Sequence, residues 1–355
     1  MVLGVDELTV RAPTRIDLAG GTLDIYPLYL FAGGGATLNI AIDIFSTVKV
    51  RTGGAKGLLL RSLDLGEEMA VAEPTEAPED GSLALLGRAV RHFSLPLSRL
   101  NTGLEIITSN EAPKGSGLGA SSSLLIALIF ALKHYLDSTA LNEGRGARGL
   151  EEVLSISADL EAQLIGIPVG TQDYYAALYG GVSRIDYGVA TRIHRHISLS
   201  PSFSRTLQDS LILTFTGAPH YSAVTNWGMV KAYIEDSGST RRRMQDIKET
   251  ALAMGAALES EDLGQFARLI SREWQNRKGL ADGVTTPFTE ELIARAEKAG
   301  ALASKICGAG GGGCLLTVAP PEPEVRQLIL SSLVEAGAQH LPFTFSPLGV
   351  SVLSN

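Results

Sequence analysis

The sequence predicts an α+β fold in two layers, with mixed strands and helices rather than a doubly wound sheet. Apolar strands and two helices share the first half of the chain, and helices dominate the second half. The regular strand–helix alternation of a Rossmann sheet is absent. The chain has 355 residues, of which 45% are hydrophobic. Because single cores stop growing at about 250–300 residues, this length favours two domains.

Strands in the first half are predicted from runs of β-branched and apolar residues. Leu8–Arg11 and Arg15–Ala19 read as two short strands separated by Pro13. Ala36–Arg51 suits a long strand or a hairpin, and Leu104–Thr108 is a strand that runs into a turn. These strands are expected to form the sheet of an N-terminal domain.

Two helices follow in the first half. Ser121 to Tyr135 is apolar nearly all round, which predicts a deeply buried helix, and Leu150–Leu164 is more amphipathic. Asp64–Gly81 is acidic and contains proline, so we expect a solvated excursion. Thr191 to Ser204 is polar and irregular, and we expect it to cross between the domains.

The second half is expected to combine helices with short strands. The predicted helices are Arg241–Leu258, Leu263–Arg277, Thr289–Lys298 and Glu322–Glu335, and the predicted strands are Leu211–Thr216, Ser304–Ile306 and Cys314–Val318. The predicted domains are residues 1–195 and 205–355.

Charge and cysteine content restrict the classes of partner. The net charge is −8, so neither nucleic acid nor an anionic membrane is expected to bind. Cys307 and Cys314 flank one glycine-rich stretch and fit neither a redox pair nor a zinc site, so we expect reduced, buried thiols. The longest apolar run, Leu124 to Leu132, is shorter than the ~20 residues that span a bilayer. With no signal peptide evident, a cytoplasmic protein is expected.

A glycine-rich loop at the start of the buried helix is the sharpest chemical signal. Its sequence is Pro113-Lys114-Gly115-Ser116-Gly117-Leu118-Gly119-Ala120-Ser121-Ser122-Ser123. Glycines allow close backbone approach, and the free amides and dipole of a helix N-terminus attract anions. The spacing fits neither a Walker A motif nor GxGxxG. The alternative is a tight turn with serine caps and no ligand, in which Lys114 is solvated.

This loop resembles motif 2 of the GHMP kinases, a family named for galactokinase, homoserine kinase, mevalonate kinase and phosphomevalonate kinase. The resemblance implies that the loop wraps the triphosphate of ATP and that a serine ligates Mg²⁺. That serine would be Ser121, with Ser122 as a substitute, while Ala120 stands where many relatives have another serine. The implied ATP-binding residues here are Pro113, Gly115, Ser116, Gly117, Leu118, Gly119, Ala120, Ser121 and Ser122.

The segment Arg11–Asp24 resembles motif 1 of the same family. The resemblance implies that Asp24 binds sugar hydroxyls, that Arg15 lies near the transferring phosphoryl group, and that neighbouring residues contact the acceptor. A carboxylate can accept from two hydroxyls, and a guanidinium stabilises phosphoryl charge. The alternatives are a turn-forming Asp24 and a surface-paired Arg15. The neighbouring acceptor-side residues are Gly20, Gly21 and Thr22.

Two further segments complete the resemblance. Lys305–Cys314 resembles motif 3, which implies ATP contacts from Gly308, Gly310 and Gly311; the alternative is a flexible linker. Glu161–Asp173 resembles the family stretch that carries two carboxylates. It implies that Glu161 ligates Mg²⁺ and that Asp173 deprotonates or orients the attacking hydroxyl. The alternatives are a solvated Glu161 and a turn-capping Asp173.

The C-terminal half is most similar to the D-glycero-D-manno-heptose kinase and L-fucokinase branch, through the segments that begin at Trp274, Thr286 and Ala299. Trp274 is expected in the core, and Arg277 and Lys278 as surface charges near the mouth of the cleft. Relatives often have arginine at the position of His220. Its absence puts an acceptor phosphate in doubt and gives weight to a neutral sugar.

The resemblance implies an N-terminal domain like ribosomal protein S5 domain 2 and a ferredoxin-like C-terminal domain, with the active site between them. It implies transfer of the γ-phosphoryl group of ATP, with Mg²⁺, to a hydroxyl of a heptose, heptose phosphate or related sugar, the anomeric hydroxyl being favoured. A mevalonate- or homoserine-type kinase and an inactive sugar and ATP sensor are the alternatives. Monomer and homodimer are both left open.

Overall fold

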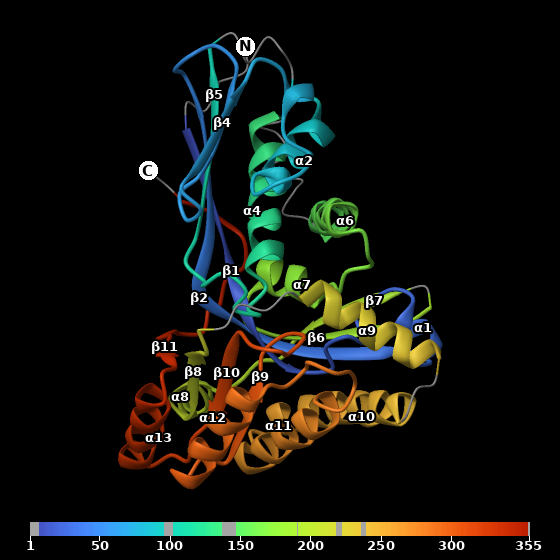
Figure 1. The fold of residues 1–355 in the computed structure, drawn as a ribbon, viewed down its shortest axis with the longest axis vertical. Helices are drawn as coiled ribbons and strands as arrows, with labels where there is room; N and C mark the ends of the chain where they lie inside the picture. The colour runs from blue at the N-terminus through green and yellow to red at the C-terminus, as the bar shows by residue number, and fades with distance from the viewer. Residues whose placement is uncertain are drawn as a thin grey trace.

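Two β-sheets with helices packed on them organise the chain in the computed structural model (Figure 1). The structure describes residues 7–95, 102–136, 147–189, 191–217, 222–235 and 239–353. The strands are β1 (Glu7–Ala19), β2 (Gly35–Thr52), β3 (Leu58–Ser62), β4 (Glu67–Val71), β5 (Leu104–Asn110), β6 (Val182–Tyr187), β7 (Arg192–His196), β8 (Leu211–Phe215), β9 (Ala303–Ile306), β10 (Cys314–Val318), β11 (Gln339–His340) and β12 (Ser351–Leu353). The helices are α1 (Leu28–Phe31), the 3₁₀ helix η1 (Pro74–Glu76), α2 (Ala84–Phe93), α4 (Ala120–Leu136), α6 (Ala147–Ile165), α7 (Gln172–Tyr179), α8 (Pro201–Ser210), α9 (Ser222–Ile234), α10 (Thr240–Glu259), α11 (Leu263–Arg277), α12 (Pro287–Lys298) and α13 (Pro323–Glu335).

The large sheet is built around β2. Its strand order is β12-β1-β2-β5-β3-β4, with β6 also paired to β2 and β7 paired to β6. One edge of β2 pairs with β1, while on the other edge residues 46–52 pair with β5 and residues 35–40 pair with β6. β5 therefore leaves β2 close to the point where β6 joins it. This brings the loop after β5 next to the chain that leads into β6.

The two long strands differ from the expected ones. β1 is one strand rather than two, because Pro13 is accommodated at a register shift between Pro13 and Thr14. β2 is a single strand and not a hairpin. Its second half alternates between buried and half-buried residues, whereas its first half is buried throughout, as expected where helices cover both faces of a sheet.

The buried helix begins at Ala120 and ends at Leu136, within a residue of the prediction at each end. It packs against β1 and β2 of the large sheet, and α2 and α6 pack against it on the same side of the sheet (Figure 1). A single cluster of buried apolar side chains fills the space between these helices and the strands. In the described part of the chain, no helix combines the length and the apolar character needed to cross a membrane.

The second sheet has the strand order β11-β8-β10-β9, and every pairing in it is antiparallel. Helices α9 to α12 lie between β8 and β9 along the chain, and α13 lies between β10 and β11. This is the predicted ferredoxin-like arrangement. Ile16 and Leu38 of the large sheet belong to the same buried cluster as Leu316 and Ile270, so the two sheets share a core.

The expected irregular crossing at Thr191–Ser204 is wrong, because β7 and the start of α8 occupy it. β7 is mostly exposed, which explains its polar sequence. α8 begins with Pro201 in its first turn, and the Ser200 hydroxyl accepts a hydrogen bond from the Phe203 amide at 3.2 Å. Asp64–Gly81 is largely exposed as expected, although β4 lies within it.

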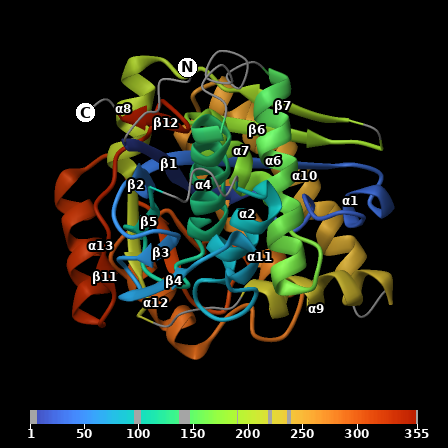
Figure 2. The ribbon, with the colours of Figure 1, turned by 90° about the horizontal axis from the view of Figure 1, so that it is seen from above.

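We keep the division into 1–195 and 205–355 as a proposal. Every strand of the large sheet lies within residues 7–196 except β12, and the small sheet lies within residues 211–340. β12 returns from the end of the chain and lies beside β1 in Figure 2, with Leu353 opposite Thr9. The large sheet therefore also contains one strand, β12, from the second of the proposed domains.

Candidate active site

A cleft of about 510 Å³ lies where the loop after β5, the start of α4, the end of α6 and the turn after β1 come together. Most of the residues predicted from the sequence line it. They are Arg15, Gly21, Thr22, Asp24, Gly115, Ser116, Gly117, Gly119, Ala120, Ser121, Ser122, Glu161, Asp173 and Gly308. Five others lie outside its lining: Gly20, Pro113, Leu118, Gly310 and Gly311.

The glycine-rich loop has the alternating backbone that its sequence predicts. Gly115, Gly117 and Gly119 have φ of +71°, +73° and +75°, a region that residues with a side chain rarely adopt. Such alternation turns successive amides toward one concave side, which binds anions. α4 begins directly after the loop at Ala120 and adds the positive end of its dipole. The loop and helix together can therefore hold phosphate.

The second glycine-rich stretch, after β9, packs backbone to backbone on this loop. A side chain at Gly117 would come within 2.6 Å of the Cys307 carbonyl, and one at Gly313 within 2.7 Å of the Ser116 carbonyl. The Cys314 amide also donates to the Ser116 carbonyl at 2.8 Å. Both cysteines are buried and unpaired, as expected. Gly117 and Gly313 are needed because two loops almost 200 residues apart in the sequence pack backbone to backbone here.

Only one of the three glycines predicted to bind ATP in this stretch faces the cleft. Gly308 lines it. Gly310 instead packs against Val284, whose carbonyl oxygen would lie 2.4 Å from an added side chain. The Gly311 amide donates to the same carbonyl at 2.6 Å. The ATP contacts of Gly310 and Gly311 stay predictions, and a structural role accounts for both glycines.

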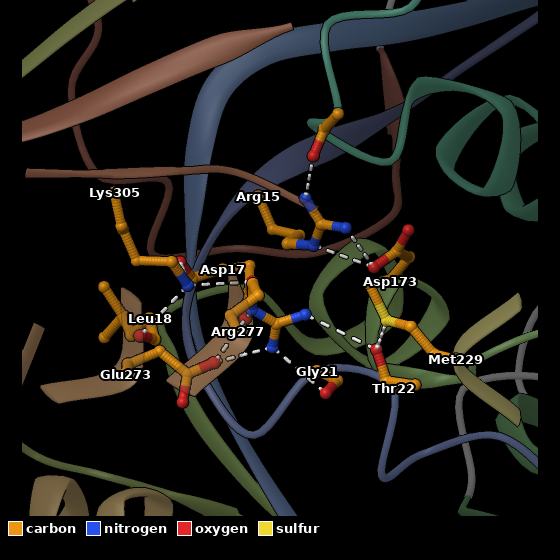
Figure 3. A network of polar contacts seen from close by, with 11 residues as sticks. Arg15, Asp17, Leu18, Gly21, Thr22, Asp173, Met229, Glu273, Arg277 and Lys305 are labelled. Atoms are coloured by element: carbon orange, nitrogen blue, oxygen red, sulfur yellow. Dashed lines mark hydrogen bonds and ion pairs between the residues drawn. The ribbon is translucent and has the colours of Figure 1, made fainter. Parts of the chain in front are cut away.

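Arg15 and Asp173 form an ion pair at the centre of the cleft. Arg15 Nε and Nη2 lie 2.7 and 2.6 Å from Asp173 Oδ1, and Nη1 donates to the Gly117 carbonyl at 2.5 Å (Figure 3). Asp173 lies in the first turn of α7. Burial raises the pKa of Asp173, and Arg15 opposes that rise. The pair links the glycine-rich loop to the proposed base.

Glu161, near the end of α6, faces the start of α4. Its Oε2 accepts hydrogen bonds from Ser122 Oγ at 3.0 Å and from the hydroxyl of Tyr174. Burial raises the pKa of Glu161, and the Tyr174, Ser121 and Ser122 hydroxyls oppose that rise. Ser121 is exposed on the cleft, whereas Ser122 is 6% exposed and turned to Glu161.

This donor set fits Mg²⁺. The ion takes few protein ligands, prefers oxygen, and usually completes its shell with water and substrate phosphates. Glu161 and Ser121 supply a carboxylate and a hydroxyl beside the phosphate-binding loop. Among the described residues no group of three or more His, Cys, Asp or Glu side chains could hold a metal alone. A site shared with nucleotide phosphates is what these residues suit.

Asp24, predicted to bind the acceptor, is buried in the wall of the cleft. Its Oδ2 accepts a hydrogen bond from the Gln172 amide at 3.0 Å, and a side chain at Gly170 would lie 2.4 Å from the same oxygen. Burial raises the pKa of Asp24 to about 6. Gly20, with φ +87°, makes the turn before it, where an added side chain would meet the Ala36 carbonyl at 1.8 Å.

Arg277 is not the surface charge that the sequence suggested. Its side chain is 1% exposed, lines the cleft, and forms an ion pair with the fully buried Glu273 (Figure 3). The signal was present: Glu273 and Arg277 are four residues apart and so share a helix face. Trp274 is buried as predicted. Lys278 is half-buried and lies 3.6 Å from Glu290.

A second buried pair went unnoticed in the sequence. Lys305 and Asp17 are both fully buried, with Lys305 Nζ 2.9 Å from Asp17 Oδ2. Lys305 also donates to the carbonyls of Asp17 and Leu18 at 2.9 and 3.2 Å. It therefore fixes β9 to the end of β1 beneath the cleft. His220, singled out from the sequence, lies outside the described residues.

A cleft built around a loop that can hold phosphate suits a phosphotransferase that uses a nucleotide. Two family profiles identify it further: "GHMP kinases N terminal domain" matches residues 84–181 and "GHMP kinases C terminal" matches residues 241–334. Together they cover more than half of the chain. The chain belongs to the GHMP kinase superfamily.

Several relatives act on sugars. The chain is 27% identical over 96% of its length to L-fucokinase/L-fucose-1-P guanylyltransferase of Bacteroides fragilis, and spans 38% of that protein. It is 26% identical over 97% of its length to D-glycero-alpha-D-manno-heptose 7-phosphate kinase of Campylobacter jejuni, of which it covers 98%. The crystal structure of a D-glycero-D-manno-heptose 1-phosphate kinase from Bacteroides thetaiotaomicron shares the fold, with a TM-score of 0.75, 24% identity, and coverage of 98% and 99% of the two chains.

Proposed function

We propose that this protein is an ATP-dependent sugar kinase that transfers the γ-phosphoryl group to a hydroxyl of a heptose or a related sugar, the anomeric hydroxyl being favoured. One observation carries the proposal. Two carboxylates, the buried Asp24 and the partly exposed Asp173, line the same cleft as the glycine-rich loop. A hydroxyl-rich acceptor can therefore be bound by one carboxylate while the other faces its reacting hydroxyl.

The nucleotide side depends on the backbone of the glycine-rich loop and the start of α4. Their amides donate to phosphate oxygens and the helix dipole favours negative charge. Lys114 is exposed at the rim of the loop, where a flexible ammonium can reach the outer phosphates. Ser121 and Glu161 would hold Mg²⁺, which, when bound, neutralises charge on the phosphates.

The chemical step falls to Asp173 and Arg15. Asp173 accepts, or at least orients, the proton of the attacking hydroxyl through Oδ2, because Oδ1 already holds both Arg15 nitrogens. The raised pKa of Asp173 suits this role, since burial makes its carboxylate a stronger proton acceptor. The Arg15 guanidinium places positive charge between this carboxylate and the loop that holds the phosphates. Phosphoryl transfer needs little more than such positioning and charge stabilisation.

An unphosphorylated sugar is the acceptor that the charge pattern favours. Each of the three buried cations at or beneath the cleft faces its own carboxylate: Arg15 with Asp173, Arg277 with Glu273, and Lys305 with Asp17. Asp24 has no ion-pair partner among the described residues, so the acceptor side offers a hydrogen-bond acceptor rather than a free positive charge. Hydroxyl groups match this better than a phosphate.

A panel of acceptors in an ADP-release assay tests the proposal. It holds D-glycero-D-manno-heptose, its 7-phosphate, L-fucose, D-galactose, mevalonate and homoserine, and phosphorus NMR identifies the phosphorylated position. Turnover of a free sugar with a new anomeric phosphate is expected. Turnover of mevalonate or homoserine alone would refute the sugar assignment. ATP binding without turnover of any acceptor would favour a sensor, although Ser121, Glu161 and Asp173 are all present.

A further inference from the structure

The turn that carries the acceptor-side residues has a backbone that needs support. Thr22 has φ +74°, and it is one of three residues other than glycine with positive φ in the described part of the chain. A β-branched residue in this region is an outlier and persists only where its surroundings hold it. Thr22 lines the cleft and lies two residues before Asp24. Whatever holds Thr22 therefore also places Asp24.

The support comes from the C-terminal domain (Figure 3). Arg277 Nη2 donates to the Gly21 carbonyl at 3.0 Å, and Nη1 lies 3.4 Å from Thr22 Oγ1. The same Thr22 hydroxyl donates to Met229 Sδ at 3.4 Å. Arg277 is the last residue of α11 and Met229 belongs to α9. Two C-terminal helices thus hold a turn that follows the first strand of the N-terminal sheet.

Arg277 is itself held in place by Glu273. Nε and Nη2 of Arg277 donate to Glu273 Oε1 at 2.9 and 2.6 Å, and both side chains are buried. Glu273 does not line the cleft, whereas Arg277 does. The planar guanidinium spreads its donors over the carboxylate and the turn, a geometry that the point charge of a lysine at this position would not reproduce. Glu273 can therefore influence the acceptor only through Arg277 and the turn.

We propose that Arg277 is a positioning residue for the acceptor: braced by Glu273, it fixes the Gly21–Thr22 turn and so makes acceptor affinity depend on the C-terminal domain. The inference rests on the proposed function, because it assigns the acceptor to the Asp24 side of the cleft. Among the described residues, Arg277 forms its hydrogen bonds and ion pair with Glu273, Gly21 and Thr22, and none with the glycine-rich loop, Ser121 or Glu161. Nucleotide affinity should therefore be independent of it.

The test measures two Michaelis constants in each variant, with the acceptor that the wild type turns over. Arg277→Lys and Glu273→Gln are expected to raise the acceptor KM roughly 10-fold or more, with the ATP KM changed less than about 2-fold. The double variant should be no worse than the poorer single variant, because both changes act through one contact. Arg272→Lys is the matched control, since Arg272 is exposed on the same helix and pairs with Asp246 and Glu249.

Other outcomes would overturn the proposal. Equal rises in both KM values, or a lowered Tm with both KM values unchanged, would leave Arg277 and Glu273 with a general structural role. An effect of Arg277→Lys with none of Glu273→Gln would show direct acceptor contact in place of positioning. The proposed function fails separately, if the wild type turns over no sugar. Arg277 is then tested with whichever acceptor is turned over or raises the Tm. If no acceptor does either, the result contradicts both proposals.

Discussion

Arg15 holds Asp173 through a single carboxylate oxygen. Two of the three guanidinium nitrogens, Nε and Nη2, contact Oδ1 at 2.7 and 2.6 Å, and the third, Nη1, donates to the Gly117 carbonyl. Oδ2 lies on the other side, near Gly119. The two oxygens of this carboxylate therefore differ in their contacts: Oδ1 keeps the side chain oriented, and Oδ2 is the oxygen that we propose faces the substrate.

Replacing Asp173 with asparagine should preserve the orientation and remove the proton acceptor. The amide oxygen can still accept from Arg15, so we expect kcat to fall roughly 100-fold or more while ATP affinity stays nearly the same. Steady-state kinetics and calorimetric titration with ADP measure the two quantities. Asp186→Asn is the control, because Asp186 pairs with Arg184 and Arg195 away from the cleft. Unaltered turnover in Asp173→Asn would remove the assigned role.

Gly119→Ala should impair catalysis through Asp173. An added Cβ would lie 2.9 Å from Asp173 Oδ2, and the φ of +75° would be strained. We expect roughly a 10-fold lower kcat or worse and a loss of about 1–3 kcal/mol in stability. Gly66→Ala is the control for backbone strain alone, because Gly66 has φ +67° and no atom within 4 Å of the added Cβ. Equal kcat losses in the two variants would contradict the contact with Asp173.

The two serines at the start of α4 should differ in their effect on magnesium dependence. Both line the cleft, but Ser121 is exposed on it, whereas Ser122 is buried and donates to Glu161. Ser121→Ala and Glu161→Gln are therefore expected to raise the Mg²⁺ concentration needed for half-maximal velocity by about 10-fold or more, and Ser122→Ala by less. Titrating velocity against Mg²⁺ at saturating ATP gives the order. The reverse order for the serines would transfer the ligand role to Ser122.

Protonation of Asp24 should weaken acceptor binding at low pH. Its pKa is raised to about 6 from 3.8 by burial, so its charged form is lost as the pH falls through about 6. Hydroxyl recognition by the carboxylate weakens there, and kcat/KM for the acceptor should fall with it. The pH profile of kcat/KM measures this. In Asp24→Asn, activity should be low throughout and this fall at low pH absent; a persisting fall near pH 6 would assign it to another group.

The raised pKa of Asp24 also predicts how stability depends on pH. Ionisation of Asp24 should lower stability, whereas ionisation of a salt-bridged carboxylate raises it. Because the pKa of Asp24 is higher in the folded than in the unfolded protein, the ionised carboxylate opposes folding. This cost in stability is complete at pH values above the folded pKa, and it disappears as the pH falls toward the unfolded pKa. Asp24→Asn should therefore raise Tm at about pH 8 and change it little at about pH 4. A lower Tm at the alkaline pH would contradict the burial cost.

Short-range signals in the sequence predicted most of the residues that line the candidate site. Alternate glycines before an all-apolar helix predicted the phosphate-binding loop, and α4 begins within one residue of the expected position. Glu161 and Asp173 were assigned by resemblance, and both face the cleft. These residues were accessible because each lies in a local pattern of turn, cap or helix start. The family and the α+β fold, including the ferredoxin-like domain, were also predicted.

Residues whose role depends on distant partners were missed. The sequence around Arg277 suggests a surface charge, and only the packing of α11 against the turn at Gly21 shows that this residue is buried. In the same way, nothing local in the sequence indicates that Lys305 forms an ion pair with Asp17. β7 and α8 were taken for an irregular crossing because an exposed edge strand has no apolar alternation to reveal it. Pairing across hundreds of residues is a property of the fold, and no local pattern of one sequence encodes it.

The pairing of β12 with β1 has a consequence for how the protein is made. During synthesis the stretch Thr9–Arg11 of β1 lacks its neighbour until Ser351–Leu353 has left the ribosome, so the large sheet is completed only after the strands of the small sheet have been made. An edge strand without its neighbour invites pairing with other chains. Variants that lack Ser351–Leu353 should therefore give a lower yield of native protein, whereas an inserted purification handle should be tolerated in the exposed turn at Gly66.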